Sequence, residues 1–581
     1  MKHIKSLILA TLLGASFTSC NDFLNLEPLN DIVLENFWTD KSDVETALLG
    51  VYEALASSDC IKRICLWGEI RADNYVEGNQ TSEDIRQLLR ENLIYTNSYC
   101  NYVSFYNVIN RANTILYFAP QVAEKDPNYL YDELLAHEAE AITLRCLSYF
   151  YLIRSFHDVP YVLEPSIDDE GGRAKFYVPQ SSFEDILDSL ITDLEHVKKY
   201  AVNKYASVDA NTGRITRATI CALLADMYLW RGRADDWDKC IAVCEEVNTL
   251  KRADYDKIKG KQGQLSDLRL YNNYPLISDV WDEDYLGNAF YEIFGIGNSF
   301  ESLFELPYSI DVKNPTKGFY LSTWMNQTNY GELKVFPKVG DSFSGTGNDV
   351  FEQPLDNRYY HNVFDFSGDP SQYMPGKYII SDLEVYISGG DIELDYASYR
   401  SSENSAQANW IIYRYSEVLL FEAEAYLAKA RRAGDGSEDA KTFKSKAFDL
   451  IDAVNKRAIG IDNEKIEKTD PKTLESMGYK TSTLEEMENL LLKERRRELM
   501  FEGKRWYDLV RFSRREGNQE RLIKAIDARH DGATMSAIKI KLRNPYAMYF
   551  PIARDEMRKS EGYLKQNPAY KDDEKIEQSS H

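Results

Sequence analysis

Residues 490–512, LLLKERRRELMFEGKRWYDLVRF, combine the densest run of charges in the chain with regularly spaced apolar residues. At about 100° per residue, the apolar positions that share one stripe are Leu492, Leu499, Trp506 and Val510. Such a stripe is typical of a helix packed against a core. The segment therefore predicts a buried helix, with Gly503 as the point where it can bend.

Two charged residues of this helix, Arg495 and Glu502, fall inside the apolar stripe. A buried charge is tolerated only when it is paired and hydrogen-bonded, so we expect an ion-pair network beneath the helix. A second charged group lies about a third of a turn away and contains Glu494, Glu498, Arg505 and Asp508. Because no nucleophile and no His accompany the ERRRE run, a structural role is favoured over a catalytic one.

The chain has 581 residues, enough for one large domain or two smaller ones. Its formal net charge of -24 argues against a nucleic-acid partner, because phosphates are bound by clustered Lys and Arg. The chain also carries 40 Tyr, 25 Phe and 8 Trp. Much of this content belongs to a core, but Tyr and Trp also provide the half-polar faces on which sugars and peptides stack.

Residues 1–20 have the layout of a lipoprotein signal peptide. Two lysines precede an apolar run, and two small residues then lead to Cys20, an arrangement that resembles a lipobox with Phe17 in place of the usual Leu. We expect lipidation of Cys20, followed by a lipid-anchored tether over residues 21–40. The alternative is a plain secretory signal in which the Cys is coincidental.

Helical periodicity and end signals predict a series of helices in both halves of the chain. The predicted helices cover residues 41–56 with Asp40 as N-cap, 131–156, 181–200, 216–231 and 234–249, and helices resume near Trp410 and continue to about Lys524. In residues 260–408 this periodicity disappears. There Gly, Pro, Asn and Asp interrupt short apolar pieces rich in aromatics, as in irregular insertions that carry binding residues. Residues 571–581 form a polar tail.

A short pattern occurs twice among these helices, as Ala225 with Tyr228 and as Ala423 with Tyr426. This Ala-x-x-Tyr spacing, followed by a turn and a second helix, resembles the tetratricopeptide pattern. In that pattern the small Ala lets paired helices approach, and the Tyr packs on a neighbour. Since the copies are few and separated, they predict a scaffold inside one domain rather than an open solenoid.

No catalytic, cofactor or metal motif appears in the sequence. The chain lacks G-x-S-x-G, a phosphate loop and H-E-x-x-H, and its seven His are scattered. The seven cysteines after Cys20 favour buried thiols, although Cys60, Cys65 and Cys100 leave a disulfide among them open. We expect no enzymatic activity, no cofactor and no metal.

Four separated motifs resemble signatures of the SusD/RagB family of surface lipoproteins. They are the lipobox at Cys20, YFYLIRSFHDVPY at residues 149–161, ERRRELMFEGKRWYDLVR at residues 494–511 and the C-terminal QNPAY, where Ala569 replaces the family's usual Gly. They occur in the family's order over nearly the whole chain. The resemblance implies an all-α-dominated, tetratricopeptide-like scaffold with long irregular loop and short-strand insertions.

The resemblance also implies one domain over residues 41–570, with its helical scaffold at about 41–259 and 409–524 and its ligand-facing insertions at about 260–408. It implies a binding protein without enzymatic activity, anchored by lipid to the outer-membrane surface. Its expected partner is a SusC-like TonB-dependent outer-membrane barrel, which the protein caps as a lid. Captured ligand would then pass from the lid into the barrel.

The ligand implied by most relatives is an oligosaccharide, and a minority bind peptides. The expected contact residues are Asp73, Asn74, Tyr75, Tyr99, Tyr102, Trp281, Tyr285 and Trp324. Taken alone, each of them is equally compatible with a turn or a core aromatic. An adhesion or scaffolding protein and a surface hydrolase are the remaining alternatives, and the hydrolase would require turnover of a polysaccharide or peptide.

Overall fold

The computed structural model describes residues 37–167, 177–259, 268–278, 289–307, 331–340, 350–353, 355–364, 370–388, 391–399, 409–459 and 472–571. Within these ranges the chain is mostly helical, which confirms the predicted fold class. Cys20, residues 21–36 of the predicted tether and the polar tail beyond Lys571 lie outside the described residues. Trp38, in contrast, is buried and Asp40 caps the first long helix, so the last residues of the predicted tether belong to the folded domain. None of the described helices has the length and apolar run that a bilayer span requires.

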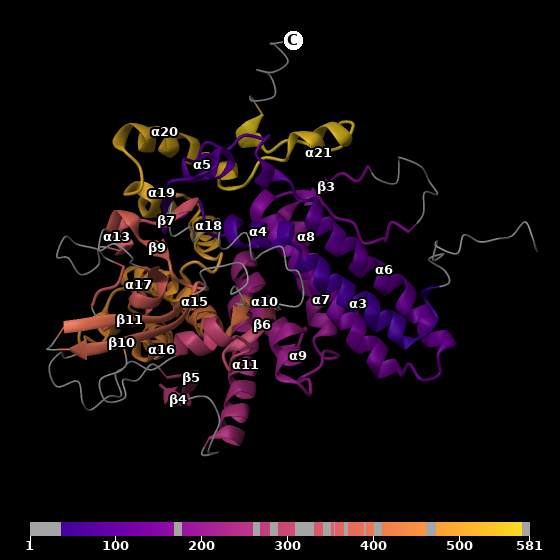
Figure 1. The fold of residues 1–581 in the computed structure, drawn as a ribbon, viewed down its shortest axis with the longest axis horizontal. Helices are drawn as coiled ribbons and strands as arrows, with labels where there is room; N and C mark the ends of the chain where they lie inside the picture. Colours follow the sequence, from indigo (N-terminus) through magenta and orange to yellow (C-terminus); the bar gives the residue numbers. More distant parts are fainter. Residues whose placement is uncertain are drawn as a thin grey trace, which may run out of the picture.

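The N-terminal half is a set of packed helices. They are α3 (Lys41–Leu55), α4 (Ser58–Trp67), α5 (Glu83–Leu89), α6 (Val103–Lys125), α7 (Tyr131–Phe156), α8 (Phe183–Val197), α9 (Val208–Gly213), α10 (Arg217–Arg231) and α11 (Asp236–Ile258). α6 packs against α3 and α7, α7 packs against α8, and α10 packs against α11. Figure 1 shows α3, α6 and α7 as long, side-by-side rods at the right of the molecule.

The C-terminal helices form the other side of the scaffold. They are α15 (Tyr415–Ala433), α16 (Glu438–Ala458), α17 (Leu484–Leu499), α18 (Arg505–Glu516), α19 (Glu520–Asp527), α20 (Gly532–Leu542) and α21 (Arg554–Lys559). α15 packs against α16, α17 and α11, so it joins the two halves of the chain. The last helices lie across the top of the molecule in Figure 1.

The strands of the described residues form two-stranded antiparallel sheets. The pairs are β1 (Tyr75–Glu77) with β7 (Leu333–Val335), β2 (Val159–Pro160) with β3 (Gln180–Ser181), β4 (Leu268–Tyr271) with β5 (Tyr274–Ile277), β6 (Ser302–Leu306) with β12 (Trp410–Arg414), β8 (Val363–Phe364) with β9 (Met374–Pro375), and β10 (Ile380–Ser388) with β11 (Asp391–Tyr399). Short helices η3 (Tyr291–Ile296), α13 (Pro337–Gly340) and α14 (Arg358–Asn362) lie between them.

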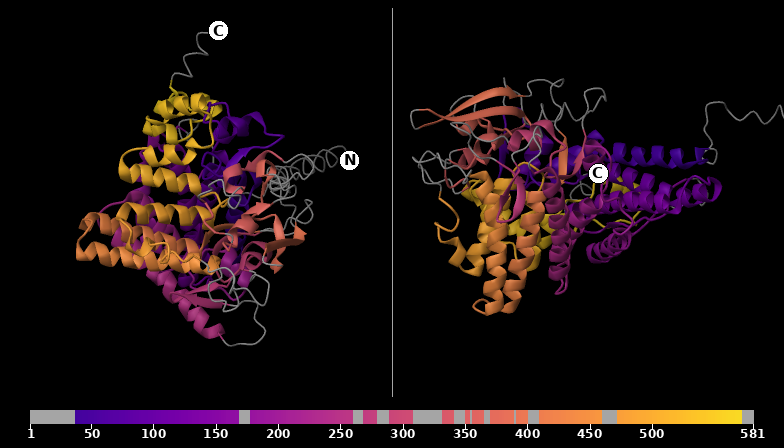
Figure 2. Two further views of the ribbon diagram at one scale, coloured as in Figure 1. Left: turned by 90° about the vertical axis from the view of Figure 1, so that its left-hand side faces the viewer. Right: turned by 90° about the horizontal axis from the view of Figure 1, so that it is seen from below.

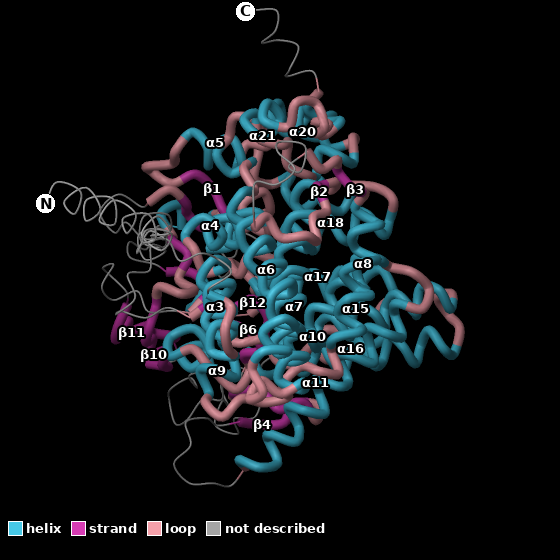
Figure 3. Tube along the Cα trace, turned by 90° about the vertical axis from the view of Figure 1, so that its right-hand side faces the viewer, coloured by secondary structure: helices cyan, strands magenta, loops and turns pink. Residues whose placement is uncertain are grey.

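Because these strands are short, helices make up most of the described molecule, and the β10–β11 hairpin lies at one edge of it (Figure 3). In the right-hand view of Figure 2 the hairpin lies on one side of the molecule, and α15 and α16 project on the other. The β10–β11 hairpin therefore lies on the side of the scaffold opposite α15 and α16.

Local signals in the sequence account for the helix boundaries. Asp40 caps α3 as predicted: its side chain accepts from the backbone N–H of Ser42 at 2.8 Å, and Asp43 accepts from the N–H of Asp40 at 3.1 Å. The predicted bounds of the 131–156 helix are confirmed by α7. α11 continues to Ile258, beyond its predicted end at residue 249.

The two Ala-x-x-Tyr patterns lie on α10 and α15, each the first helix of a packed pair. Ala225 and Ala423 are buried, and both pairs meet where α11 contacts α15. The Tyr228 hydroxyl donates to Glu195 of α8 at 2.6 Å, so this Tyr packs on a neighbouring helix as predicted. α10 ends at Arg231, and the glycine that caps it, Gly232, has a φ of 66°.

Residues 490–512 form two helices instead of the single helix, able to bend at Gly503, that the pattern predicted. α17 ends at Leu499 and α18 begins at Arg505, and Gly503 between them has a φ of +73°. A Cβ atom at Gly503 would lie 2.6 Å from the Ile64 carbonyl oxygen. The backbone N–H of Trp506 also donates to the Gly68 carbonyl at 2.7 Å. The chain therefore turns because it is pressed against the end of α4.

Glu498 of α17 is the centre of the predicted ion-pair network, which the structure confirms. Its carboxylate pairs with Arg414 of β12 at 2.5 Å, with Arg358 of α14 at 3.1 Å and with Arg457 of α16. All four side chains are buried. Burial alone would raise the pKa of Glu498, but the three guanidinium groups hold it well below its usual range.

The two charges predicted to be buried, Arg495 and Glu502, are both paired. Arg495 lies 2.8 Å from Asp508 of α18, and Glu502 lies 2.7 Å from Lys377. Glu502 also shares the Arg414 guanidinium with Glu498. The network thus joins α17 to α18, to β12 and to the insertions.

The seven cysteines of the described residues are all buried. This confirms the interpretation of these side chains as thiols in the core. Burial raises the pKa of the Cys100 and Cys146 thiols above its ordinary value, which keeps them protonated.

We expect Glu498→Gln to lower the free energy of unfolding by about 3–5 kcal/mol, because three buried guanidinium groups lose their carboxylate. Urea unfolding followed by circular dichroism measures this loss. Glu485→Gln, at an exposed position of the same helix, is the matched control and should change stability by about 0.5 kcal/mol or less. Equal stabilities of the two variants would contradict the central role of Glu498.

We expect the buried His361 to make the free energy of unfolding fall in acid. Its buried ring stacks on Phe290 with centroids 4.1 Å apart, and burial, assisted by Lys377, lowers its pKa to about 3. In the unfolded chain His takes up a proton near about pH 6.5, so the folded state is fully stabilised above that pH and loses stability as the pH falls toward about 3.

In His361→Phe this loss, up to about 1.4 kcal/mol per pH unit, should be absent. Urea midpoints at about pH 7 and about pH 5 test it, with His196→Phe at an exposed His as control. The same pH dependence in wild type and His361→Phe would refute the prediction.

Candidate functional site

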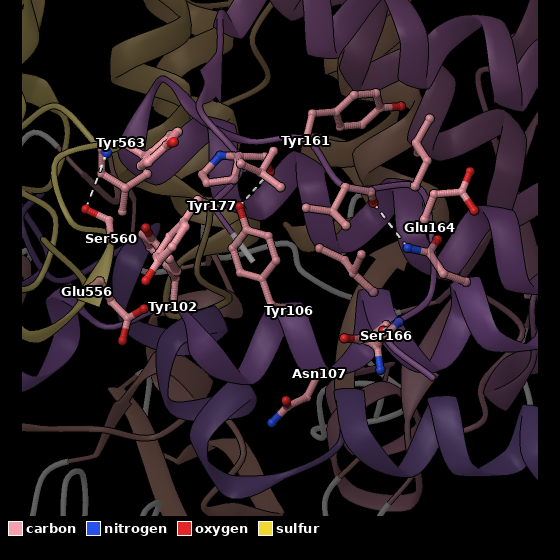
Figure 4. A pocket seen from close by; sticks show the side chains of 18 of the residues that line it. Tyr102, Tyr106, Asn107, Tyr161, Glu164, Ser166, Tyr177, Glu556, Ser560 and Tyr563 are labelled. Carbon is pink, nitrogen blue, oxygen red and sulfur yellow. Dashed lines mark hydrogen bonds between the residues drawn. The ribbon is translucent and has the colours of Figure 1, made fainter. Parts of the chain in front are cut away.

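A cavity of about 760 Å³ opens between α6, the chain that follows α7, and the segment around α21. Figure 4 shows it from close by. We call it the tyrosine cavity, because five tyrosines line it: Tyr102, Tyr106, Tyr161, Tyr177 and Tyr563. Its walls therefore come from both the N-terminal and the C-terminal part of the chain.

The tyrosines present aromatic faces of different orientation. Tyr177 and Tyr563 stack with their ring centroids 5.2 Å apart and an interplanar angle of 10°. Tyr102 and Tyr106 are tilted against each other at 5.4 Å. Tyr563 has 52% of its surface exposed, so the stacked pair lies at the open side of the cavity.

Local structure holds the inner tyrosines in place. The Tyr106 hydroxyl donates to the Pro160 carbonyl oxygen at 2.7 Å, which ties α6 to β2. The Tyr102 ring meets Phe156, at the end of α7, edge-on at 5.1 Å. Burial raises the pKa of Tyr102 and Tyr106, so their hydroxyls remain protonated donors.

Polar groups lie at both ends of the tyrosine cavity. Glu556 and Ser560 lie near Tyr102 and Tyr563, and Glu164 and Ser166 lie at the opposite end (Figure 4). Asn107, Asn110 and Asn113 of α6 and Lys559 of α21 also belong to the polar lining. Aromatic faces bordered by a few amide, hydroxyl and carboxylate groups form the kind of surface that binds polyhydroxylated or peptide ligands.

The acidic side chains of the lining are Glu164 and Glu556. Among its described residues there is no His and no Cys, so no nucleophile is paired with an imidazole base. In the described part of the chain no three or more His, Cys, Asp or Glu side chains are grouped so that they could hold a metal ion.

Three of the predicted contact residues are engaged inside the protein. Asp73 is buried and lies 3.0 Å from Arg496 and 2.9 Å from Arg505. Burial alone would raise its pKa, but the two arginines lower it to about 2. Asn74 is buried beside it and accepts from Arg496 at 2.8 Å, and Tyr75 stacks on Phe501.

The other predicted contacts divide into two groups. Tyr102 lines the tyrosine cavity, whereas Tyr99 is half-buried outside its lining and its carbonyl oxygen accepts from the Trp67 indole at 2.9 Å. The structure therefore joins Tyr102 to the cavity and does not bring Asp73, Asn74, Tyr75 or Tyr99 to it. Trp281, Tyr285 and Trp324 lie outside the described residues.

Four tyrosines of the cavity are not among the predicted contact residues: Tyr106, Tyr161, Tyr177 and Tyr563. Two of them lie in or beside motifs that the sequence shows. Tyr161 ends the YFYLIRSFHDVPY motif, and Tyr563 directly precedes LKQNPAY. In that C-terminal segment the Gln566 side chain exchanges two 2.8 Å hydrogen bonds with the backbone of Ile552, which fixes the chain that carries Tyr563.

Comparison with known proteins assigns the chain to a family. The profile described as the SusD family matches residues 354–570, and a related profile described as "Starch-binding associating with outer membrane" matches residues 22–229. A SusD-like protein of Formosa agariphila is 26% identical over 532 residues, which covers 88% of this chain and 92% of that protein. A second SusD-like protein of the same organism is 23% identical and covers 88% and 90%.

Solved structures share the fold. A laminarin-binding SusD-like protein superposes with a TM-score of 0.59 at 20% identity, covering 92% of this chain and all of that one. Surface glycan-binding protein A from Bacteroides thetaiotaomicron, in complex with laminarihexaose, gives 0.57 at 20% identity and covers 91% of this chain and 100% of its own. With two profiles matching its two ends and the fold in common, the chain belongs to the SusD/RagB family.

Proposed function

We propose that this protein captures oligosaccharides in the tyrosine cavity as a non-catalytic nutrient-binding protein of the cell surface. The observation that carries the proposal is the set of five tyrosines around a cavity of about 760 Å³, with the stacked pair Tyr177 and Tyr563 at its open side. The weakly polar faces of sugar rings pack on aromatic rings, and sugar hydroxyls bond the amide and carboxylate groups between them.

The ligands in the names of similar proteins support a glycan. One solved relative is a laminarin-binding protein, and another holds laminarihexaose. β-Glucans are therefore the first ligands to test. A peptide is the alternative ligand, which the same aromatic walls would take up through side-chain pockets and backbone hydrogen bonds.

The proposal includes anchorage and a partner. Lipidation at Cys20 would hold the protein on the outer-membrane surface, with residues 21–36 as a tether. There it would cap a SusC-like TonB-dependent barrel and release its ligand into that barrel. The description of the family profile over residues 22–229, associating with outer membrane, supports this location.

Loss of the stacked pair tests the binding site. We expect Tyr563→Ala and Tyr177→Ala each to weaken laminarin-oligosaccharide binding by about threefold to tenfold, because each removes one aromatic face worth about 0.5–1.5 kcal/mol. Isothermal titration calorimetry measures the dissociation constants. Tyr131→Ala, at an exposed tyrosine outside the cavity, is the control and should bind like wild type.

Unchanged affinity in both cavity variants would contradict glycan binding at this site. If wild type binds peptides but no glucan, and Tyr563→Ala weakens peptide binding, the tyrosine cavity is still the binding site. Its ligand is then a peptide rather than an oligosaccharide.

Native purification tests the partner and the anchor. We expect a TonB-dependent barrel to co-elute in stoichiometric amount when the protein is extracted in mild detergent, because lid and barrel form one complex. Cys20→Ala should abolish incorporation of radiolabelled palmitate and release the protein from the membrane fraction. A protein that elutes alone, while other barrel complexes survive the same detergent, would contradict the lid role.

A further inference from the structure

The chain that follows α7 gives the tyrosine cavity a surface of a second kind. Its apolar residues in the lining include Val162, Leu163 and Pro165, and α6 adds Ile109 to the same lining. Leu163 has 44% of its surface exposed, and Val162 is half-buried. We call these four residues the aliphatic wall. The cavity thus offers aliphatic side chains as well as aromatic rings to a ligand.

Hydrogen bonds inside the protein already use the backbone of this wall. The Val162 N–H donates to the Tyr149 hydroxyl at 2.7 Å, and the Val162 carbonyl oxygen accepts from Asn113 at 3.1 Å. The Ser166 N–H donates to the Asn110 side-chain oxygen at 2.8 Å. These contacts hold the segment against α6 and α7 and occupy two of the amide side chains of the lining. What the segment offers a ligand here is therefore mainly its apolar side chains.

The aromatic and aliphatic surfaces extend toward different ends of the cavity. Figure 4 shows Tyr563 and Glu556 at one end and Glu164 at the other. Leu163 and Pro165 are the neighbours of Glu164 in the chain, so the aliphatic wall belongs to this second end. A cavity of about 760 Å³ has room for a ligand that reaches both ends with chemically different parts.

The aliphatic wall fits an unsubstituted or an acidic glycan poorly. Sugar hydroxyls placed against it would lose hydrogen bonds to water without replacing them. Glu164 is exposed and has no ion-pair partner among the described residues, so it would repel a uronate or a free fatty acid at this end. The group that suits the wall is both neutral and apolar.

We propose that the tyrosine cavity selects oligosaccharides that carry an O-acyl ester, with a sugar ring on the tyrosines and the acyl chain on the aliphatic wall. An ester is neutral beside Glu164, and its alkyl chain gains from leaving water. This inference deepens the proposed function and rests on it for the saccharide, while the acyl group is argued from the aliphatic wall alone.

The test titrates the full-length protein in a calorimeter with laminaritriose, its mono-O-acetyl and mono-O-butanoyl esters, sodium butanoate and the peptide Ala-Leu-Ala. We expect the acetyl ester to bind about twofold to fourfold more tightly than laminaritriose, because one methyl group is buried. The butanoyl ester should bind more tightly again, and butanoate alone should not bind measurably.

Variants locate the gain in affinity. Leu163→Ser should bring the affinity ratio of ester to laminaritriose close to one, whereas Leu130→Ser, at a leucine that is 61% exposed outside the cavity, should keep the wild-type ratio. Tyr563→Ala, at the other end of the cavity, should weaken laminaritriose and its esters by the same factor.

The outcomes separate this inference from the proposed function. Equal affinities of laminaritriose and its esters, or the same ratio in Leu163→Ser and wild type, would overturn the inference and leave glycan binding on the tyrosines intact. If Ala-Leu-Ala binds, Leu163→Ser weakens that binding and no saccharide binds, the aliphatic wall serves a peptide side chain and the inference is wrong. If none of these ligands binds, the inference and the proposed function both fail.

Discussion

The arrangement of the scaffold and its insertions depends on the ion pairs that the Glu498 carboxylate makes with three buried arginines. It draws together Arg358 of α14, Arg414 of β12 and Arg457 of α16, elements that are far apart in the sequence. A guanidinium in a core is costly unless a charge of opposite sign is held against it, so sharing this carboxylate favours the positions in which the three elements meet. Apolar packing alone would hold the elements less specifically, because it has no direction.

A second set of contacts joins the segment after α4 to the turn between α17 and α18. The Glu69 carboxylate accepts from the backbone N–H groups of Phe501, Lys504 and Arg505 at 3.0–3.2 Å, so it satisfies the turn between α17 and α18. Asp73, four residues later, holds the side chain of Arg505. The polar run after α4 therefore serves as an internal cap for the break between α17 and α18.

The sequence allowed the parts of the fold that depend on local patterns to be predicted. The bounds of α7, the Asp40 cap and the buried pairs of Arg495 and Glu502 follow from periodicity and from the cost of burying charge. The break at Gly503 could be expected only as a bend, because its cause is the backbone of α4, far away in the sequence. Asp73 and Asn74 have the composition of a binding loop, and their contacts with the distant Arg496 and Arg505 could not be predicted from the sequence. The tyrosine cavity escaped prediction for the same reason, since its walls meet only in the folded chain.

The tyrosine cavity combines Tyr102 and Tyr106 with Tyr563, which lies close to the end of the 581-residue sequence. A chain is synthesised from its N-terminus, so the first half of the site exists for most of synthesis without the wall that completes it. The cavity can form only after the segment that carries Tyr563 has been made, which follows the helices that carry Tyr102 and Tyr106 by most of the described chain. A chain that stopped before Tyr563 would keep the scaffold helices but lose one wall of the cavity, so a formed cavity reports that this segment has folded against α6.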